Sequence, residues 1–370
     1  MNTRSLKLWL TAALAIPFLM SAALAQSVTT SLASLPDADL LIYISPQRFL
    51  NDAAPRIMPA KDITEMRAGF ADMKKSVGID PSTVEYLVLA VRFHKPAGDL
   101  SFVAPDVMAV FGGDFSADSL FSLAQLTLQD KVRIEKHGSK TMALMRLDAI
   151  AAEAEKMPLL KSFVEVGAVP LSANSIAIGN LPYLKSAIDA ADGTGRINPA
   201  TLESLMRDPN VLAAGAGTPL ASFAKSLGLF GTETSAREGT CNTSFGNFYS
   251  ALTLSGTNFS VRGAMNADNP DTAKIITSLL SSLLRPGAKP DAQTQSVLES
   301  IKLTGKEADM MWTIMKSVKM MPRDNEVVWE ADIPQQVIAD SLKPKPAAAS
   351  KTEAKPVSTP KRRVRRKRTN

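Results

Sequence analysis

Few residues in this sequence of 370 could carry chemistry. There are two histidines, His94 and His137, and one cysteine, Cys241. A single cysteine excludes an internal disulfide, a cysteine-based zinc site and an iron–sulfur cluster. The histidines lie in different predicted hairpins, with no sequence neighbour to complete a triad or a metal site. We therefore expect both to be structural, with His137 solvated in its turn, and we predict no metal and no cofactor.

The sequence Ser222-Phe-Ala-Lys225 matches the S-x-x-K pattern, in which a lysine helps to activate a nucleophilic serine. The companion motifs S-D-N and K-T-G are absent, as are G-x-S-x-G, H-E-x-x-H and the phosphate-binding G-x-x-x-x-G-K-[ST]. We interpret this segment as a helix with Phe223 and Leu227 facing the core. No catalytic residue is predicted.

Residues 310–321 read MMWTIMKSVKMM and are rich in methionine. Thioethers are soft ligands that suit Cu(I), which an exported bacterial protein could encounter. However, Trp312, Ile314 and Val318 alternate with the methionines, and methionine commonly fills irregular gaps in cores. We favour a packed segment over a copper site. Cys241 lies in a polar stretch and could pair with another chain in an oxidising compartment, but we expect it to stay unpaired.

The strongest chemical signal is the basic C-terminus. Residues 343–370 contain Lys, Pro, Ala and Ser with almost no large apolar residue, so we predict a disordered tail. Flexible cationic chains bind polyanions by releasing counterions, without sequence preference. No aromatic residue is present for base stacking. The predicted polyanion-binding residues are Lys361, Arg362, Arg363, Arg365, Arg366, Lys367 and Arg368. A solvated tail with no fixed partner stays open as the alternative.

The charge of the chain is divided unevenly. The formal net charge is +6, but residues 343–370 alone hold eleven basic residues and one acidic residue. With the two basic residues of the N-terminal leader also set aside, residues 26–342 contain 29 basic and 35 acidic residues. A mildly acidic body therefore carries a tail of charge +10.

Residues 1–25 have the order of a secretion signal. Arg4 and Lys7 precede an apolar stretch from Leu8 to Leu19, and residues 23–25 form a small-x-small cleavage site. The apolar stretch is shorter than the roughly 20 residues that a membrane span needs. We expect a cleaved signal and a protein exported to the periplasm or beyond, with no membrane span after cleavage.

The body repeats one order of elements: a strand, a helix, two strands, a helix, a hairpin and a helix. In the first half we expect strands at 39–45, 84–93 and 107–111, a hairpin at 132–147, and helices at 62–77, near 116 and at 148–157. In the second half we expect strands at 211–216, 248–254 and 258–265, a hairpin at 318–332, and helices at 219–227, 270–284, 292–301 and 334–342. A strand at 175–179 and a helix at 182–191 in the first half have no counterpart.

Because hairpins dominate these connections, the predicted fold class is α+β, with mainly antiparallel sheets and helices packed on one face. The expected domains are the signal peptide (1–25), an N-terminal linker (26–34), a first lobe (35–196), a second similar lobe (197–342) and the tail (343–370). An internal repeat and two unrelated α+β domains both remain open.

Two short motifs accompany this order. Leu35-Pro36-Asp37-Ala38-Asp39 leads into the first strand, and Gly78-Ile79-Asp80-Pro81 precedes the strand that follows. With the signal peptide, they resemble a loose group of uncharacterised exported bacterial proteins. The resemblance covers most of residues 35–342. It implies export and a two-lobe α+β architecture, and supplies no catalytic residues.

Taken together, the sequence predicts an exported, non-enzymatic protein that binds or scaffolds at the cell envelope. Its tail would contact an anionic envelope polymer or surface, or extracellular nucleic acid without specificity. Two alternatives stay open: a ligand-binding protein with a site between the lobes, and a carboxylate-based enzyme. The sequence does not indicate the oligomeric state or the ligand.

Overall fold

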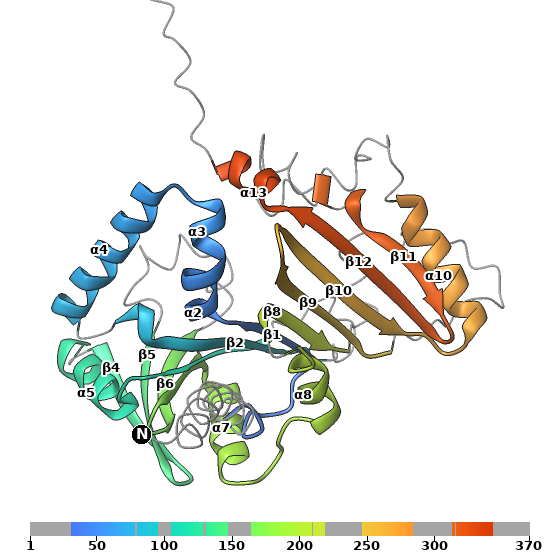
Figure 1. Ribbon diagram of the computed structural model, residues 1–370. Coiled ribbons are helices and arrows are strands. Elements are labelled where there is room, and N and C mark those ends of the chain that lie inside the picture. Colours follow the sequence, from blue (N-terminus) through green and yellow to red (C-terminus); the bar gives the residue numbers. More distant parts are fainter. Residues whose placement is uncertain are drawn as a thin grey trace, which may run out of the picture.

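A computed structural model of the chain describes residues 31–77, 80–94, 105–128, 131–146, 164–208, 210–218, 246–283, 313–314 and 316–342. The strands of this part join into one 12-stranded antiparallel sheet (Figure 1), in the order β11-β12-β10-β9-β8-β1-β2-β3-β7-β6-β5-β4. The signal peptide and the basic tail of the sequence analysis lie outside the described residues.

The strands are bounded as follows: β1 (Leu40–Ile44), β2 (Val84–Arg92), β3 (Asp106–Gly113), β4 (Val132–His137), β5 (Lys140–Arg146), β6 (Glu165–Ser172), β7 (Ser175–Asn180), β8 (Val211–Gly217), β9 (Phe248–Ser255), β10 (Asn258–Asn266), β11 (Lys319–Arg323) and β12 (Glu326–Pro334). The predicted antiparallel α+β class is thereby confirmed. The predicted hairpin turns are also present, with Gly138, Gly256 and Asp324 at positive φ in the β4–β5, β9–β10 and β11–β12 turns.

The helical segments are α2 (Pro46–Arg48), the π-helical turn η1 (Phe49–Ala53), α3 (Ala54–Ile57), α4 (Ala60–Val77), the 3₁₀ turn η2 (Pro81–Thr83), α5 (Ala117–Leu128), α7 (Leu181–Ala191), α8 (Pro199–Leu205), α10 (Pro270–Leu283) and α13 (Gln335–Leu342). In this described part, no helix is both long and apolar enough to cross a membrane.

The strands of both predicted lobes belong to the same sheet. β1 pairs antiparallel with β8 over five residue pairs, from Leu40 opposite Gly217 to Ile44 opposite Ala213. Outward from this seam, β2 and β3 follow on one side, and β9 and β10 on the other. Next comes β12 with β11 on the second side, whereas the hairpin β6–β7 separates β3 from β5 and β4 on the first. The described residues therefore do not form two lobes with a separate sheet in each.

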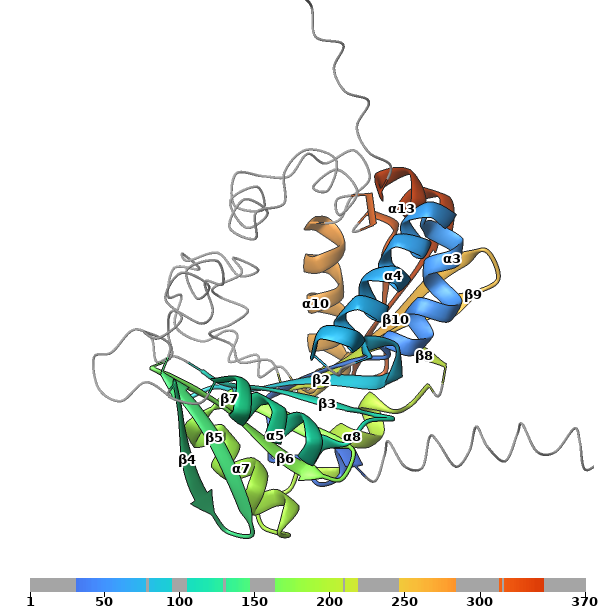
Figure 2. The ribbon, with the colours of Figure 1, turned by 90° about the vertical axis from the view of Figure 1, so that its left-hand side faces the viewer.

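The core lies on opposite faces of the sheet in the two halves. Cross-strand partners share a face, so the register carries the assignment from strand to strand. Leu41, Val88 and Met108 point to what we call the α7 face, where α7 covers the first half and α8 packs on β8 and β9 beside the seam (Figure 2). Ile42 and Val261 point to the other side, the α3 face, where α3, α10 and α13 cover the second half. The expectation of helices on one face only is therefore wrong.

Two elements depart from the sequence pattern. Strand β6 was not predicted, because Pro170 interrupts its apolar run; the structure accommodates this proline next to a register shift between Pro170 and Ser172. Helix α4 forms as predicted, with Ile63, Met66 and Phe70 at helical spacing, but none of these side chains is buried. Helix α4 therefore contributes little to the core, which α7 and α3 supply instead.

Candidate functional site

The most highly connected polar cluster lies at one end of the sheet, where β2 ends and β3 begins. Arg92 and Asp106 stand directly opposite each other in the β2–β3 register. The strand alternation that turns Val88 and Ala90 toward α7 also turns Arg92 toward it, and Asp106 occupies the same face as Met108. The pairing of the two strands thus places a cation and a carboxylate together at the edge of the apolar core.

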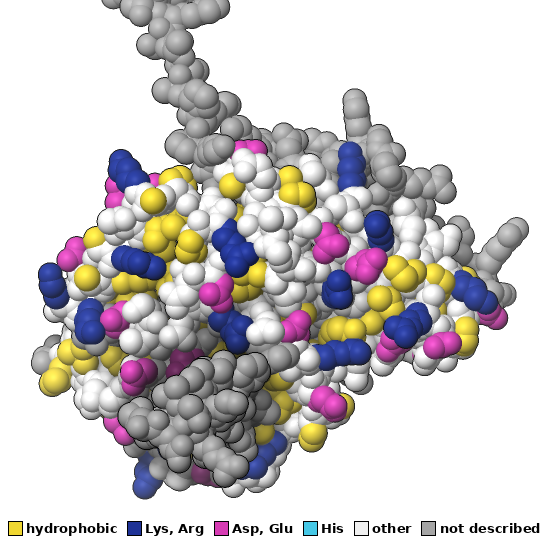
Figure 3. All heavy atoms as spheres, viewed as in Figure 1, with side chains coloured by type: hydrophobic (Ala, Val, Ile, Leu, Met, Phe, Trp, Pro, Cys, Tyr) yellow, Lys and Arg dark blue, Asp and Glu magenta, His cyan; other side chains and the backbone are white. Residues whose placement is uncertain are grey.

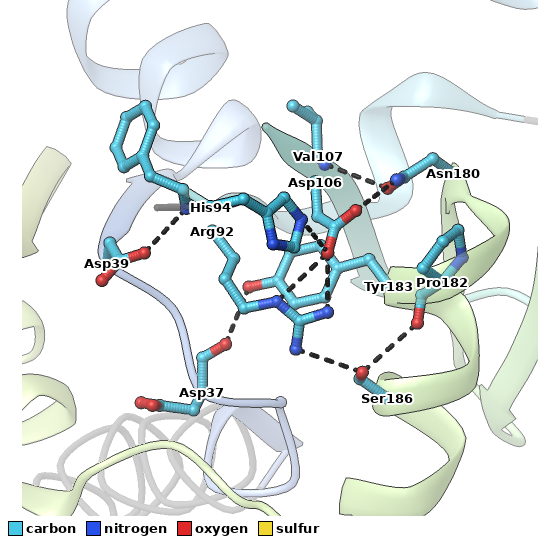
Figure 4. A network of polar contacts seen from close by, with 11 residues as sticks. Asp37, Asp39, Arg92, His94, Asp106, Val107, Asn180, Pro182, Tyr183 and Ser186 are labelled. Atoms are coloured by element: carbon cyan, nitrogen blue, oxygen red, sulfur yellow. Dashed lines mark hydrogen bonds and ion pairs between the residues drawn. The ribbon is translucent and has the colours of Figure 1, made fainter. Parts of the chain in front are cut away.

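Asp106 lies at the centre of this cluster (Figure 4) and is 3% exposed. Its Oδ2 accepts hydrogen bonds from Arg92 Nε at 3.1 Å and Nη2 at 2.6 Å, and lies 3.0 Å from Nε2 of His94. Its Oδ1 accepts from Nδ2 of Asn180 at 2.6 Å. Asn180 Oδ1 in turn accepts from the backbone N–H of Val107 at 3.0 Å. Both carboxylate oxygens are therefore engaged.

These contacts determine the ionisation of Asp106. Burial alone would raise the pKa of its carboxyl, because a buried carboxylate loses hydration. The hydrogen bonds from Arg92, Asn180 and His94 outweigh burial, and the pKa lies below its ordinary value. Asp106 is thus an anion at neutral pH and acts as an acceptor, and it is poorly suited to donate or take up a proton.

The Arg92 guanidinium connects the cluster to α7. Its Nη1 donates to Oγ of Ser186 at 3.2 Å, and its Cζ lies 4.7 Å from the centre of the Tyr183 ring. Tyr183 is fully buried, and its hydroxyl donates to the carbonyl of Asp37 at 3.0 Å. Burial is the main cause of the raised pKa of Tyr183, so the phenol stays neutral. An aromatic face, a carboxylate and a hydroxyl thus surround one guanidinium.

The motif Leu35–Asp39 finds a structural role here. Leu35 is buried in the α7-face core, and Asp37 supplies the carbonyl that accepts from Tyr183. Asp39 accepts the backbone N–H of Phe93 at 2.7 Å, just past the end of β2. In the second motif, Asp80 accepts from the backbone N–H of Ser82 at 3.0 Å and caps the turn η2. Both motifs fix chain direction at strand ends.

His94 is the most exposed member of the charged cluster, with 41% of its side chain accessible. The contact of Nε2 with Asp106 orients the ring, as carboxylates orient histidines in acid–base sites. In the described part of the chain, no three His, Cys, Asp or Glu side chains lie close enough to hold a metal ion. The polar cluster therefore joins β2, β3, β7 and α7.

The second histidine, expected to be solvated in its turn, is 31% exposed and also takes part in a similar junction. Its Nε2 lies 2.9 Å from Oδ1 of Asp189 on α7. Its neighbour Ser139 donates to Asp192 at 2.8 Å, a contact that lowers the pKa of that carboxyl. Lys185 pairs with Glu135 at 2.8 Å. Alternate residues of the edge strand β4 and its turn thus bind successive turns of α7.

Sequence reasoning could not find these partners. His94 and Asp106 are separated by a stretch that the pattern does not align, and His137 lies 52 positions from Asp189. The one available signal was the predicted β2–β3 pairing, whose register brings Arg92 opposite Asp106. Once that register is known, the charge pair follows.

Other residues singled out in the sequence divide into two groups. The tail residues Lys361–Arg368, together with Ser222, Lys225 and Cys241, lie outside the described residues. Met320 and Met321 lie on β11, where Met320 is half-buried opposite Trp329 and Met321 is 41% exposed opposite Val328. Adjacent strand residues point to opposite faces, so these two thioethers do not converge on one ion.

Carboxylate chemistry would need two acids in one cleft. Burial and the nearby Asp114 raise the pKa of Glu85, which makes Glu85 the other notable acid of the β2–β3 hairpin. It lies by the pair of Val84 and Gly113, at the far end from Asp106. Eight residues of strand separate the two ends, about 25 Å at 3.3 Å per residue. Glu85 and Asp106 therefore cannot act on one substrate bond.

A hollow of about 40 Å³ lies between α2–η1 and α4, with room for little more than a water molecule. It lies away from the β1–β8 seam, where a site between two lobes was anticipated. Its lining residues are Gln47, Leu50, Asn51, Arg67, Phe70 and Ser82.

The described chain thus defines an α+β protein built on one antiparallel sheet, with a buried carboxylate–guanidinium junction at one end. Neither protein-family models nor curated proteins match the sequence. Among solved structures, the chain is distantly similar to TP0453. Crystal form III has a TM-score of 0.40 and 11% identity, covering 84% of this chain and 96% of that one. Crystal form I has a TM-score of 0.40 and 12% identity, covering 84% and 95%.

Proposed function

We propose that this protein is an exported, non-enzymatic protein that binds anionic polymers or surfaces of the cell envelope through residues 343–370. The observation that carries the proposal is the division of charge. A body with 29 basic and 35 acidic residues precedes a tail with eleven basic residues and one acidic residue. Such a tail attracts polyanions over a long range and releases their counterions on contact.

The position of α13 supports this role. The helix ends at Leu342, one residue before the tail begins. Ile338 and Ala339 pack against the α3-face core that includes Phe259 and Ile333. The last described helix therefore follows β12 directly and ends at Leu342, at the edge of the α3-face core (Figure 1). An anionic polymer bound to the tail would be tethered to the sheet at that point.

The visible surface of the described residues within 31–342 offers no positive patch of its own that would bind a polyanion in place of the tail. On the face seen in Figure 3, Lys and Arg side chains are interspersed with Asp and Glu, and neither sign forms a continuous field among the described residues. Mixed charges of this kind cancel at distances beyond about 10 Å at 0.1 M salt. The seven basic residues near the C-terminus are the densest positive charge in the sequence.

The test uses the full mature chain and two variants of it. In the first, Lys361, Arg362, Arg363, Arg365, Arg366, Lys367 and Arg368 are replaced by Gln. In the matched control, the five arginines of this set are replaced by Lys, which preserves the charge. A chain ending at Leu342 provides a third comparison. Binding is measured against vesicles with and without anionic phospholipid, and against an acidic polysaccharide resin, over a range of salt concentrations.

We expect the natural chain and the Lys control to bind both anionic probes, with affinity falling steeply as salt rises. Seven contacts would give a slope of log K against log salt of up to about −5, at roughly 0.7 per charge for a flexible polyanion. The Gln variant and the truncated chain should lose that slope. Equal salt-dependent binding by all four proteins would contradict the proposal. Preference for one probe would identify lipid or polysaccharide as the target.

We further infer that the two halves of the sheet are copies of one unit. The support is topological: on each side of the seam, three strands follow in the same outward order, and a long helix, α5 or α10, then leads toward a hairpin. The hairpin β4–β5 corresponds to β11–β12, with β6–β7 inserted in the first half. Antiparallel pairing of β1 with β8 is what a two-fold axis through the seam would produce.

A further inference from the structure

One end of the sheet is an edge that can accept a further strand. In the described part of the chain, the sheet ends at β4, which pairs with β5 alone. Figure 2 shows β4 as the outermost strand on its side. An edge strand carries a row of backbone groups that have no partner in their own sheet, and it can therefore pair with a strand from elsewhere. Strand β11 forms the other end, so the two edges can be compared.

The turn of the β4–β5 hairpin determines which backbone groups of β4 point outward. Hydrogen-bonded residue pairs alternate with non-hydrogen-bonded pairs along an antiparallel ladder. The two-residue turn Gly138–Ser139 closes on the pair of His137 and Lys140, which is therefore hydrogen-bonded. Counting back by twos, Glu135 and Arg133 also bond to β5. The residues whose N–H and C=O groups point away from the sheet are Val132, Ile134 and Lys136.

The same counting shows that the β11 edge is blocked. Its hairpin closes on the pair of Arg323 and Glu326, so Met321 bonds inward to β12 and Pro322 stands at an outward position. Proline has no N–H to donate, and natural sheets use it to prevent pairing at an edge. The sequence of β4, VRIEKH, contains no proline. The two edges of one sheet thus differ in their capacity to pair.

The side chains of β4 are complementary to a second β4 strand. Arg133 and Glu135 lie on the α7 face, because their cross-strand partners Leu144 and Met142 belong to that core. Ile134 lies on the opposite face and is 51% exposed. The strand therefore presents a cation and an anion on one face, with an exposed apolar side chain between them on the other.

We propose that two copies of this chain associate by antiparallel pairing of β4 with β4, centred on Ile134. In this register Ile134 lies opposite Ile134 of the second copy, and Val132 lies opposite Lys136, so every outward residue joins a hydrogen-bonded pair. Arg133 lies opposite Glu135 in the closer, non-hydrogen-bonded pairs. A two-fold axis normal to the sheet relates the copies and keeps each face on its own side. This association goes beyond polyanion binding by the tail and is independent of it.

Charge selects this register over its neighbours. Only shifts by two residues keep the outward backbone groups of the two strands opposite one another. One such shift places Arg133 opposite Arg133 of the second copy, and the other places Glu135 opposite Glu135. Like charges directly opposite each other are destabilising. Arg133 already donates to Glu135 of its own strand at 2.6 Å, and its guanidinium has further N–H groups for the second copy.

The first test is a charge exchange in the full mature chain. Arg133→Glu and Glu135→Arg each place like charges opposite one another in the paired register, whereas a mixture of the two variants restores opposite charges. Lys319→Glu is the matched control, because it reverses a charge on the β11 edge. Analytical ultracentrifugation over a range of protein concentrations measures the oligomeric mass, and circular dichroism checks that each variant is folded.

Two further variants test the strand pairing without a change of charge. Ile134→Pro removes the central outward N–H, at a position equivalent to that of Pro322 on β11. Ile134→Cys is made in a Cys241→Ser background, which removes the only native thiol. Because Ile134 faces its own copy across the axis, a short bismaleimide should join two chains there. Met321→Cys, at a side chain that is 41% exposed on β11, is the control.

We expect the natural chain and Lys319→Glu to dimerise as concentration rises. Arg133→Glu, Glu135→Arg and Ile134→Pro should each stay monomeric, and the mixture of the two charge variants should dimerise again. Cross-linked dimers should form through Ile134→Cys and not through Met321→Cys. A natural chain that stays monomeric at every concentration would overturn the proposal, as would a folded mixture that fails to associate. Dimers that persist in Ile134→Pro, or that cross-link equally through Met321→Cys, would also overturn it.

Discussion

The ring of Tyr86 lies in the space that a side chain at position 112 would occupy. A Cβ atom built on Gly112 would overlap the ring and the hydroxyl of Tyr86. Tyr86 is 4% exposed and belongs to the α7-face core, so its ring has no room to move away. The absence of a side chain on β3 thus permits a large one on β2.

We expect Gly112→Ala to destabilise the protein by about 1–3 kcal/mol, because the added methyl group overpacks the core. Gly215→Ala is the matched control: its Cβ would meet the nearest atoms at 3.7 and 3.9 Å, which are ordinary contacts. Urea unfolding of the two variants tests the difference. Similar midpoints for both would show that Tyr86 adapts without cost.

Asp106→Asn removes the charge that three donors share and keeps the shape of the side chain. The guanidinium of Arg92 then faces a neutral amide, and we expect a loss of about 2 kcal/mol of unfolding free energy, the magnitude of a hydrogen bond to a charged group. The control is Asp271→Asn, whose ion pair with Lys274 is largely exposed and should leave stability close to the natural value. Chemical unfolding at pH 7 provides the measurement.

The same pair of proteins predicts a pH dependence. The pKa of Asp106 is lowered in the folded chain, so its ionised form stabilises folding above the unfolded value of about 3.9, and this stabilisation is lost as the pH falls through the folded pKa. The stability gap between the natural chain and Asp106→Asn should therefore be constant from pH 7 to about 5 and shrink below pH 4. A gap that widens on acidification would contradict the assignment of Asp106 as an anion.

Buried phenols give a fourth prediction. Burial raises the pKa of Tyr43, Tyr86 and Tyr183, three of the four tyrosines in the chain. In an alkaline titration followed by tyrosinate absorbance, the native protein should ionise these three only when it unfolds. The predicted trace for these three phenols is a delayed, cooperative rise in absorbance that coincides with loss of the circular dichroism signal. Smooth ionisation of all four near pH 10 would contradict the burial.

Helix α4 supplies a fifth prediction. Met73 is 44% exposed, whereas Ile57 of α3 is 7% exposed and contacts the α3-face core. Ile57→Ala should cost about 2–4 kcal/mol, and Met73→Ala less than about 0.5 kcal/mol. Thermal or urea unfolding of the two variants decides. A large loss for Met73→Ala would mean that α4 packs on more than α3 and η2.

The sequence predicted the strands and hairpins well, because alternation and turn residues are local signals. Val84–Phe93 and Asn258–Met265 are found as β2 and β10, almost at the predicted ends. The sequence could not predict how the strands assemble. The pairing of β1 with β8 joins residues about 170 positions apart. No local pattern in Leu40–Ile44 indicates that this strand pairs with β8 as well as with β2. The hidden strand β6 was lost because Pro170 resembles a strand breaker.

The candidate site was missed for a similar reason. Asp106 is an ordinary acid after Pro105 in the sequence, and its significance arises only when β2, β3 and β7 meet. Asn180 lies 74 positions away and Tyr183 is brought in by α7. The polyanion-binding residues of the tail, in contrast, were predicted from composition alone and stay a prediction, since their proposed action needs no partner within the chain.

Because β1 and β8 join the two halves of the sheet, the register of this short strand pair determines which way the side chains of the second half point. A slip of one residue there would turn every side chain of the second half over, so that Phe259 and Ala331 would face solvent and Arg262 would face α3. The register of the two halves is thus set by five residue pairs, which run from Leu40 opposite Gly217 to Ile44 opposite Ala213. An insertion in either half could be absorbed in a loop, but one within those five rungs would leave both hydrophobic interiors out of step.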